Sequence, residues 1–258
     1  MSGSGVNPSN FRMKKRGEKT MQTMQMVEQE TVQEKLDYSL IFSIAYGKST
    51  YEQIDTQEIK KYIKEAMKNS PSVKHSNIGG YQSGDIVNCD NSEINKLIES
   101  AENSAKEFSE RHGFLSTHIP KITNMWFNVN NKNDHNNMHI HPHSHISGTF
   151  YVNIEDADSE NWDESAFTET DGYLEIFNPL EPSISLAWSG LIENYNIFNS
   201  RSLVCNVKNN DCILFAPFLQ HRVRPHDSDY ERISISFNFQ LIPKEHESNF
   251  LLARANRR

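Results

Sequence analysis

The chain has 258 residues, of which 36% are hydrophobic and 10% aromatic, so it can bury one large core or two small ones. Its net charge of −8 disfavours nucleic acid and anionic lipid as partners, because the field of the whole molecule repels phosphate groups. The three cysteines have no CxxC spacing and no apolar stretch reaches about 18 residues, which predicts a soluble protein of the reducing cytoplasm.

Residues 1–34 are rich in Ser, Gly, Gln, Glu and Lys and have no sustained apolar period. Such a composition buries too little apolar surface to offset the loss of chain entropy, so we expect a loosely ordered tail. We expect one domain over residues 35–258, with its β-rich core at about 121–241.

Two amphipathic helices are predicted before the β-rich part of the chain. The first follows Asp55, which suits an N-cap because Glu58 stands three residues later. The second begins near Ser92, and Gly113 supplies a left-handed residue for its end. The apolar residues of both helices share one face at helical spacing, which predicts that this face packs on the core.

After Gly113 the apolar period changes to that of strands. In the last candidate strand apolar residues alternate with polar ones from Arg232 to Gln240, so each kind lies on its own face. Helices followed by many strands predict an α+β chain dominated by β-structure, a sandwich or barrel buttressed by the N-terminal helices. The candidate strands are 121–130, 146–154, 172–177, 202–207, 211–216 and 231–241.

Five of the eleven histidines lie within residues 135–145. In extended backbone His139 and His141 point to one face about 6 to 7 Å apart, close enough to share a metal ion. A third ligand is needed, and His221 is the best candidate because it follows an apolar strand and a turn. For each of the three, a hydrogen-bonded or surface histidine is the alternative. For two further histidines, His143 and His145, the sequence leaves open whether they support the metal ligands or face the solvent.

Arg232 follows His221 by eleven residues and shares the polar face of the last strand with Ser234. A guanidinium inside a barrel is costly unless an anion meets it, and its planar fork matches a carboxylate. The Ser234 hydroxyl adds one donor, so the pattern predicts a dicarboxylate pocket beside the metal. A surface ion pair of Arg232 with Asp229 or Glu231 is the alternative.

These residues resemble the iron(II)- and 2-oxoglutarate-dependent dioxygenase superfamily, which carries an HxD/E pair, a distant His and an Arg-x-Ser about ten residues later. The likeness is closest to a branch of bacterial and phage 2-oxoglutarate-iron oxygenases, and it spans about residues 70–241. It implies a double-stranded β-helix core of the jelly-roll or cupin kind. The matching segments are SNIGGYQS at 76–83, WFNVN at 126–130, HIHP at 139–142 with SGTFYV at 147–152, GYLEIFNP at 172–179, APFLQH at 216–221 and RIS at 232–234.

The resemblance also implies cofactors and roles. It implies hydroxylation of a C–H bond in an unidentified prime substrate, with O2 and 2-oxoglutarate consumed and succinate and CO2 released. Fe(II) would be held by three histidines: His139, His141 and His221. The 2-oxoglutarate would be held by Arg232 and Ser234, with further contacts from Tyr151 and Asn128.

One position departs from the superfamily pattern. The usual carboxylate ligand is replaced by His141, which would surround the iron with three neutral imidazoles and leave it more positive. Asp134 or Glu175 could restore a carboxylate, although neither has the expected spacing. A second alternative keeps only one of His139 and His141 as a ligand.

Other classes of protein share part of this pattern. A cupin-type metal-binding protein or metalloenzyme without 2-oxoglutarate would use the same histidines but gives no reason for Arg232. An inert β-sandwich with surface histidines predicts no metal. The aromatic segment 179–201 is typical of either a substrate lid or an extra packed piece of barrel. The sequence leaves the prime substrate and the oligomeric state open, a homodimer included.

Overall fold

The computed structural model describes residues 43–154, 172–196 and 198–256. The chain divides into the units Met1–Ser43 and Ile44–Arg258, and every element below belongs to the second unit. The predicted tail over residues 1–34 lies outside the described residues. Within the described part of the chain no helix is long and apolar enough to cross a membrane.

Both predicted helices are confirmed. Helix α1 spans Thr56–Asn69, and the Asp55 side chain accepts hydrogen bonds from N–H groups of its first turn. Helix α2 spans Ser92–Arg111 and is followed by Gly113 at a φ of +69°. The apolar stripes of both helices belong to one buried cluster with the strands, as their spacing predicts.

The strands form two antiparallel sheets. The first has six strands in the order β1-β9-β6-β11-β4-β3, and the second has five in the order β2-β5-β10-β7-β8. The first sheet consists of β1 (Gly47–Thr50), β9 (Asp211–Phe215), β6 (Ile146–Asn153), β11 (Arg232–Pro243), β4 (His118–Asn130) and β3 (Tyr81–Gln82). The second consists of β2 (Asn77–Ile78), β5 (His135–His139), β10 (His221–Val223), β7 (Leu174–Phe177) and β8 (Ser202–Val204).

All six predicted strands are present, but five others were not predicted: β1 and β3 of the first sheet and β2, β5 and β10 of the second. The two that carry the histidines, β5 and β10, are short, with five and three residues, and their sequences HNNMH and HRV are mainly polar. A local apolar period cannot reveal such strands, because pairing with distant neighbours holds them. The chain also has a short η2 (Lys244–His246) followed by α4 (Glu247–Ala255), which the sequence pattern did not predict.

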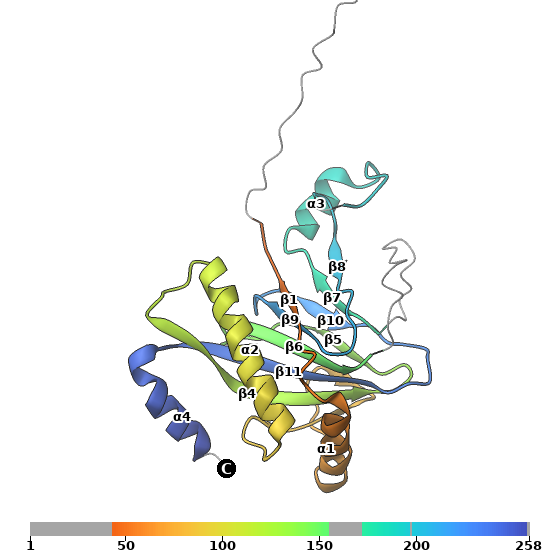
Figure 1. Ribbon diagram of the computed structural model, residues 1–258. Helices are drawn as coiled ribbons and strands as arrows, with labels where there is room; N and C mark the ends of the chain where they lie inside the picture. Colours follow the sequence, from red (N-terminus) through yellow and green to blue (C-terminus); the bar gives the residue numbers. More distant parts are fainter. Residues whose placement is uncertain (1–42, 155–171, 197, 257–258) are drawn as a thin grey trace, which may run out of the picture. The chain divides into compact units, whose positions relative to one another are not determined.

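The two faces of strand β11 point to different places, one into the hydrophobic core and the other into a pocket. Its apolar residues from Ile233 to Phe239 are buried in the cluster that includes α1 and α2, and both helices lie against this sheet (Figure 1). Its polar residues Arg232, Ser234 and Ser236 line a pocket between the sheets. The alternation predicted for this strand is therefore confirmed, and it aims the polar residues at the site.

Residues 179–201 include α3 (Glu181–Trp188), a helix with no buried residue. The alternative that this segment is a packed piece of barrel is therefore wrong for α3. No described residue of 179–201 lines either of the two hollows around the histidines, so the interpretation as a substrate lid stays a prediction.

Candidate active site

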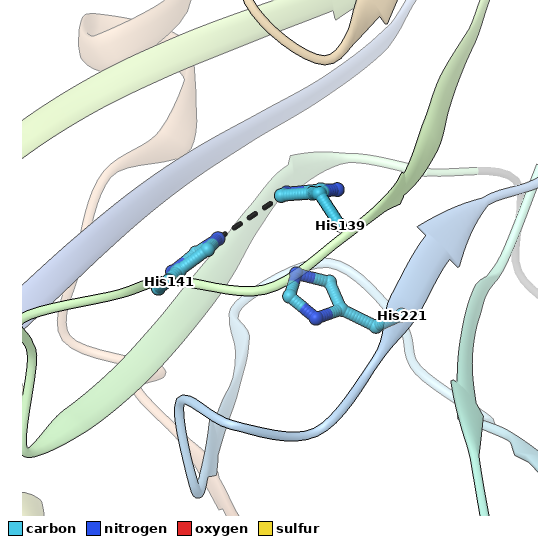
Figure 2. Close-up of side chains that lie close together, drawn as sticks. All are labelled: His139, His141 and His221. Carbon is cyan, nitrogen blue, oxygen red and sulfur yellow. Dashed lines mark hydrogen bonds between the residues drawn. The ribbon is translucent and has the colours of Figure 1, made fainter.

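Three histidines from separate places in the chain meet at the end of the second sheet. His139 ends β5, His221 begins β10, and the two are direct cross-strand partners. His141 lies two residues beyond the end of β5 and turns back toward them (Figure 2). One nitrogen of each ring lies within 4.8 Å of the others, so the predicted HxH pair and the distant His are brought together.

The hydrogen bonds of the outer ring nitrogens fix which nitrogen faces the centre. His139 Nδ1 lies 2.7 Å from Asn137 O, and His221 Nδ1 lies 2.8 Å from Leu219 O. His141 Nδ1 lies 2.7 Å from Asn238 Oδ1. These oxygens can only accept, so each Nδ1 carries the proton and donates, which leaves an unprotonated Nε2 on every ring.

The centre of the triad fits a cation. The Nε2 atoms of His139 and His141 are 3.2 Å apart, the contact drawn in Figure 2. Two neutral rings whose protons are on Nδ1 have no hydrogen for this contact, so lone pair faces lone pair. Nitrogens about 2.1 Å from one metal, at angles of about 90° to 109°, stand about 3.0 to 3.4 Å apart, and the observed separation lies in this range.

Burial keeps the three rings neutral. Desolvation lowers the pKa of His139 below its ordinary value. Desolvation, with repulsion from His139, lowers the pKa of His141 to about 4 and that of His221 to about 3. At neutral pH all three imidazoles are therefore in the form that binds a metal, with no proton to displace.

Arg232 lies inside the same pocket. It is 1% exposed, its Nε donates to Gly172 O at 2.7 Å, and its Nη1 donates to Ser234 Oγ at 3.1 Å. No carboxylate among the described residues forms an ion pair with it. The surface alternative is wrong, because Glu231 pairs with Lys64 and Asp229 lies near Lys132 instead. A buried guanidinium without a counter-ion is costly, so the pocket is built for an anion.

Two more buried polar groups beside Arg232 lack a partner. Within the part of the chain that the structure describes, the Tyr151 hydroxyl and Asn128 Oδ1 form no hydrogen bond. Strand register explains why they meet, since Ser234 of β11 pairs with Asn128 of β4 on one side and with Tyr151 of β6 on the other. Burial raises the pKa of Tyr151, which keeps its hydroxyl protonated and able to donate.

All seven residues singled out from the sequence line this one pocket between the sheets. One end carries the imidazoles and the other carries Arg232 and its neighbours. Donors at one end and free nitrogen lone pairs at the other suit a ligand that binds a metal with one group and places a carboxylate beside a guanidinium. The seven residues are His139, His141, His221, Arg232, Ser234, Tyr151 and Asn128.

No carboxylate joins the histidines. Glu175 accepts hydrogen bonds from Arg222 Nε at 2.7 Å and from Ser202 Oγ at 2.6 Å, and it does not line the pocket. Asp134 accepts from Asn131 N at 2.8 Å and is likewise absent from the lining. The expectation that either could replace the missing carboxylate ligand is wrong, so within the described residues the triad is all imidazole.

The other two histidines of the cluster lie outside the pocket. His145 Nδ1 accepts from Leu241 N at 2.9 Å, and His143 O accepts from the Gln240 side chain. Both histidines are exposed and neither lines a hollow, which places them in the solvent-facing group.

A second hollow adjoins the pocket. It shares Ser76, Trp126, His139 and His141 with the first, so it opens directly beside the imidazoles. Sequence reasoning gave these shared residues Ser76 and Trp126 no role, although both lie in the quoted SNIGGYQS and WFNVN segments. The rest of its lining is mainly apolar and amide side chains with one carboxylate, that of Asp85. We call this hollow the outer groove.

Comparison with known proteins agrees with this geometry. Residues 124–238 match the model of a family described as "Putative 2OG-Fe(II) oxygenase". This match covers both histidine positions of the HxH pair, His221 and Arg232. No curated protein sequence matches the chain.

Solved structures give the fold. The chain is similar to the non-heme alpha ketoglutarate dependent carbocyclase SnoK from nogalamycin biosynthesis, with a TM-score of 0.51 and 7% identity over 76% of this chain and 79% of that one. The epimerase SnoN from the same biosynthesis gives 0.50 and 11% over 76% and 78%. A Pseudomonas putida prolyl-4-hydroxylase gives 0.48 and 11% over 77% and 93%. The first two matches confirm the predicted double-stranded β-helix core with buttressing helices.

Proposed function

We propose that this chain, whose residues 124–238 match the model of the family described as "Putative 2OG-Fe(II) oxygenase", is an Fe(II)- and 2-oxoglutarate-dependent hydroxylase. In the proposed reaction a C–H bond of a prime substrate becomes C–OH. One oxygen atom of O2 enters the product and the other enters succinate, as 2-oxoglutarate loses CO2. The iron, when bound, supplies the oxidising chemistry.

One observation supports this function above all. Two unprotonated nitrogens face each other at 3.2 Å, in the same pocket as a buried guanidinium that has no carboxylate partner among the described residues. The first feature calls for a cation and the second for an anion. A metal with a bound dicarboxylate meets both needs at once, whereas a metal alone leaves Arg232 without a counter-ion.

The residues divide into two proposed roles. His139, His141 and His221 would hold the iron through their Nε2 atoms. Arg232 would hold the far carboxylate of 2-oxoglutarate, while Ser234 and the unpartnered Tyr151 hydroxyl donate to it. The Asn128 amide would complete this end of the pocket.

The prime substrate would enter through the outer groove. This groove is lined by His139 and His141 but not by Arg232, so a molecule in it would lie beside the iron while 2-oxoglutarate fills the inner pocket. Trp126 lines both hollows and lies 5.7 Å from the His141 ring, centroid to centroid. Its indole would separate the two ligands.

The test is succinate formation by the purified full chain with Fe(II), 2-oxoglutarate, ascorbate and O2. Slow turnover without a prime substrate is expected, and it should stop when Fe(II) is removed by a chelator. Metal binding without succinate would support the cupin-type alternative instead. Absence of both would overturn the proposal. A matched control is His145→Ala, which removes an imidazole outside the pocket and should leave turnover unchanged.

We further propose a reducing compartment, the cytoplasm, for this chain. Cys89, Cys205 and Cys212 are all unpaired. Burial raises the pKa of Cys205 and of Cys212 to about 12, so both remain thiols inside the core.

A further inference from the structure

His141 is held differently from the other two histidines. His139 and His221 each donate Nδ1–H to the backbone carbonyl two residues earlier in their own segment, Asn137 O and Leu219 O. That local arrangement comes with the backbone of β5 and of the turn just before β10. The Nδ1 of His141 instead meets side chains from the other sheet.

Two neighbouring strands supply these side chains. Ser147 of β6 and Asn238 of β11 stand opposite each other in register, and Ser147 Oγ donates to Asn238 Oδ1 at 2.8 Å. His141 Nδ1 lies 2.7 Å from Asn238 Oδ1 and 2.9 Å from Ser147 Oγ. Ser147 is fully buried and Asn238 is 8% exposed, so water does not replace either contact.

The backbone around His141 does not fix its ring. The residue lies outside any strand, Pro142 follows it, and His143 has a φ of +64°. The rotation and tautomer of this imidazole therefore depend on the groups at Nδ1. An amide oxygen that already accepts from Ser147 directs the His141 proton to Nδ1 and the lone pair of Nε2 to the centre.

We propose that Asn238, supported by Ser147, is a positioning residue that fixes His141 as a neutral metal ligand. The inference rests on the proposed metal site and goes beyond it. It assigns a role to Asn238 in the middle of β11 and to Ser147, the first residue of the SGTFYV segment, neither of which is a metal ligand. Because the acceptor is an amide, the imidazole stays neutral and the site keeps the full charge of its ion.

In the structure Oδ1 of Asn238 faces His141, and the flipped amide would predict the opposite result, so substitutions distinguish the two orientations. With Oδ1 toward His141, Asn238→Asp keeps an acceptor and should preserve or strengthen metal binding. With Nδ2 toward His141, the ring would accept, Nε2 would carry the proton, and Asn238→Asp would remove a donor. Asn238→Leu, of similar size, removes the contact in both cases.

The experiment is titration of the full chain with Co(II), followed by visible absorption and by quenching of tryptophan fluorescence, to which Trp126 beside the His141 ring contributes. Asn238→Leu should weaken Co(II) binding about 10- to 100-fold, the usual cost of losing a partner behind a metal-binding histidine. Asn238→Asp should bind at least as tightly as the parent chain. Ser147→Ala should weaken binding less, because Oδ1 of Asn238 remains. The matched control is Asn124→Leu, since Asn124 pairs with Asn238 in register but does not contact His141.

Equal Co(II) affinity in Asn238→Leu and the parent chain would overturn the inference, as would equal losses in the Leu and Asp variants. A second measurement needs no variant. Two-bond ¹⁵N–¹H spectra of the metal-free chain should show His141 with its proton on Nδ1, and a proton on Nε2 would overturn the inference. If the parent chain itself fails to bind Co(II), the metal site is wrong and this inference falls with it.

Discussion

The two ends of the pocket are built in different ways. The guanidinium end stands on β4, β6 and β11, long strands that pair with one another in register. The imidazole end stands on the ends of β5 and β10 and on the loop after β5. Long paired strands hold their side chains by many bonds at once, whereas short strands and loops hold theirs by a few. We therefore expect the imidazole end to depend more on its ligand and on single hydrogen bonds.

Removing an imidazole should have the largest effect. His221→Ala takes one of three ligands from the metal, so Co(II) binding and succinate formation are both expected to fall below detection. The measurements are the Co(II) titration and the succinate assay, with His145→Ala as the control. If the variant keeps both Co(II) binding and succinate formation, His221 is not a ligand and the metal is not held at the imidazole end of the pocket.

Changes at the guanidinium end should weaken the binding of 2-oxoglutarate while leaving the binding of the metal nearly unchanged. Arg232→Ala removes charge-assisted bonds worth about 1.5 to 3 kcal/mol, so KM for 2-oxoglutarate should rise about 10- to 100-fold. Co(II) affinity should change less than about threefold because no ligand is lost. Arg232→Lys should recover only part of KM, since an ammonium lacks the planar fork. Equal loss of both properties in Arg232→Ala would mean that Arg232 is structural.

The pH dependence of stability should also differ between regions. His141 and His221 titrate at about 4 and about 3 in the folded chain, below their ordinary value of 6.5, so the unfolded chain binds more protons between these limits. The free energy of unfolding should therefore fall as pH drops from about 6.5, by at most about 1.4 kcal/mol per pH unit for each histidine. Urea unfolding of the metal-free chain at several pH values measures this slope.

Glu175 of β7, which does not line the pocket, affects the free energy of unfolding over a lower range of pH. Burial raises its pKa, but hydrogen bonds from Arg224, Ser202 and Arg222 outweigh this and lower it to about 2. Its stabilisation is present above the ordinary carboxyl value of about 4.5 and is lost as pH falls toward 2. Glu175→Gln should keep the slope above pH 4.5 and change only the slope below it. The double variant His141→Gln with His221→Gln should instead flatten the slope from about pH 6.5 down to about 3, including the range above pH 4.5 that Glu175→Gln leaves unchanged.

The smallest effect is expected at Tyr151. Its buried hydroxyl has no hydrogen-bond partner among the residues that the structure describes, so Tyr151→Phe should leave the free energy of unfolding unchanged or raise it slightly. The same change should raise KM for 2-oxoglutarate about three- to tenfold, because the lost bond forms only with the ligand. Thermal unfolding checks the expected stability, and the succinate assay checks the expected KM for 2-oxoglutarate. A clear loss of stability would show that the hydroxyl has an internal partner.

Much of this site could be predicted from the sequence. The HxH pair, His221, Arg232 and Ser234 have chemistry that is unusual enough to single them out, and the alternation of β11 predicts which of its side chains face the pocket. The helices over 56–69 and 92–111 follow from local caps and apolar period. Such features depend on residues that are close together in the sequence, so they can be predicted without knowledge of distant contacts.

Only the tertiary structure decided the rest. Strands β5 and β10 are held by pairing across about 80 residues of chain and carry no local signal. The exclusion of Asp134 and Glu175 as ligands, and the contacts of Ser147 and Asn238 with His141, depend on which strands are neighbours and in what register. The sequence by itself determined which groups are available for chemistry. Packing of the two sheets determined which of those groups meet, because register is a property of pairs of strands.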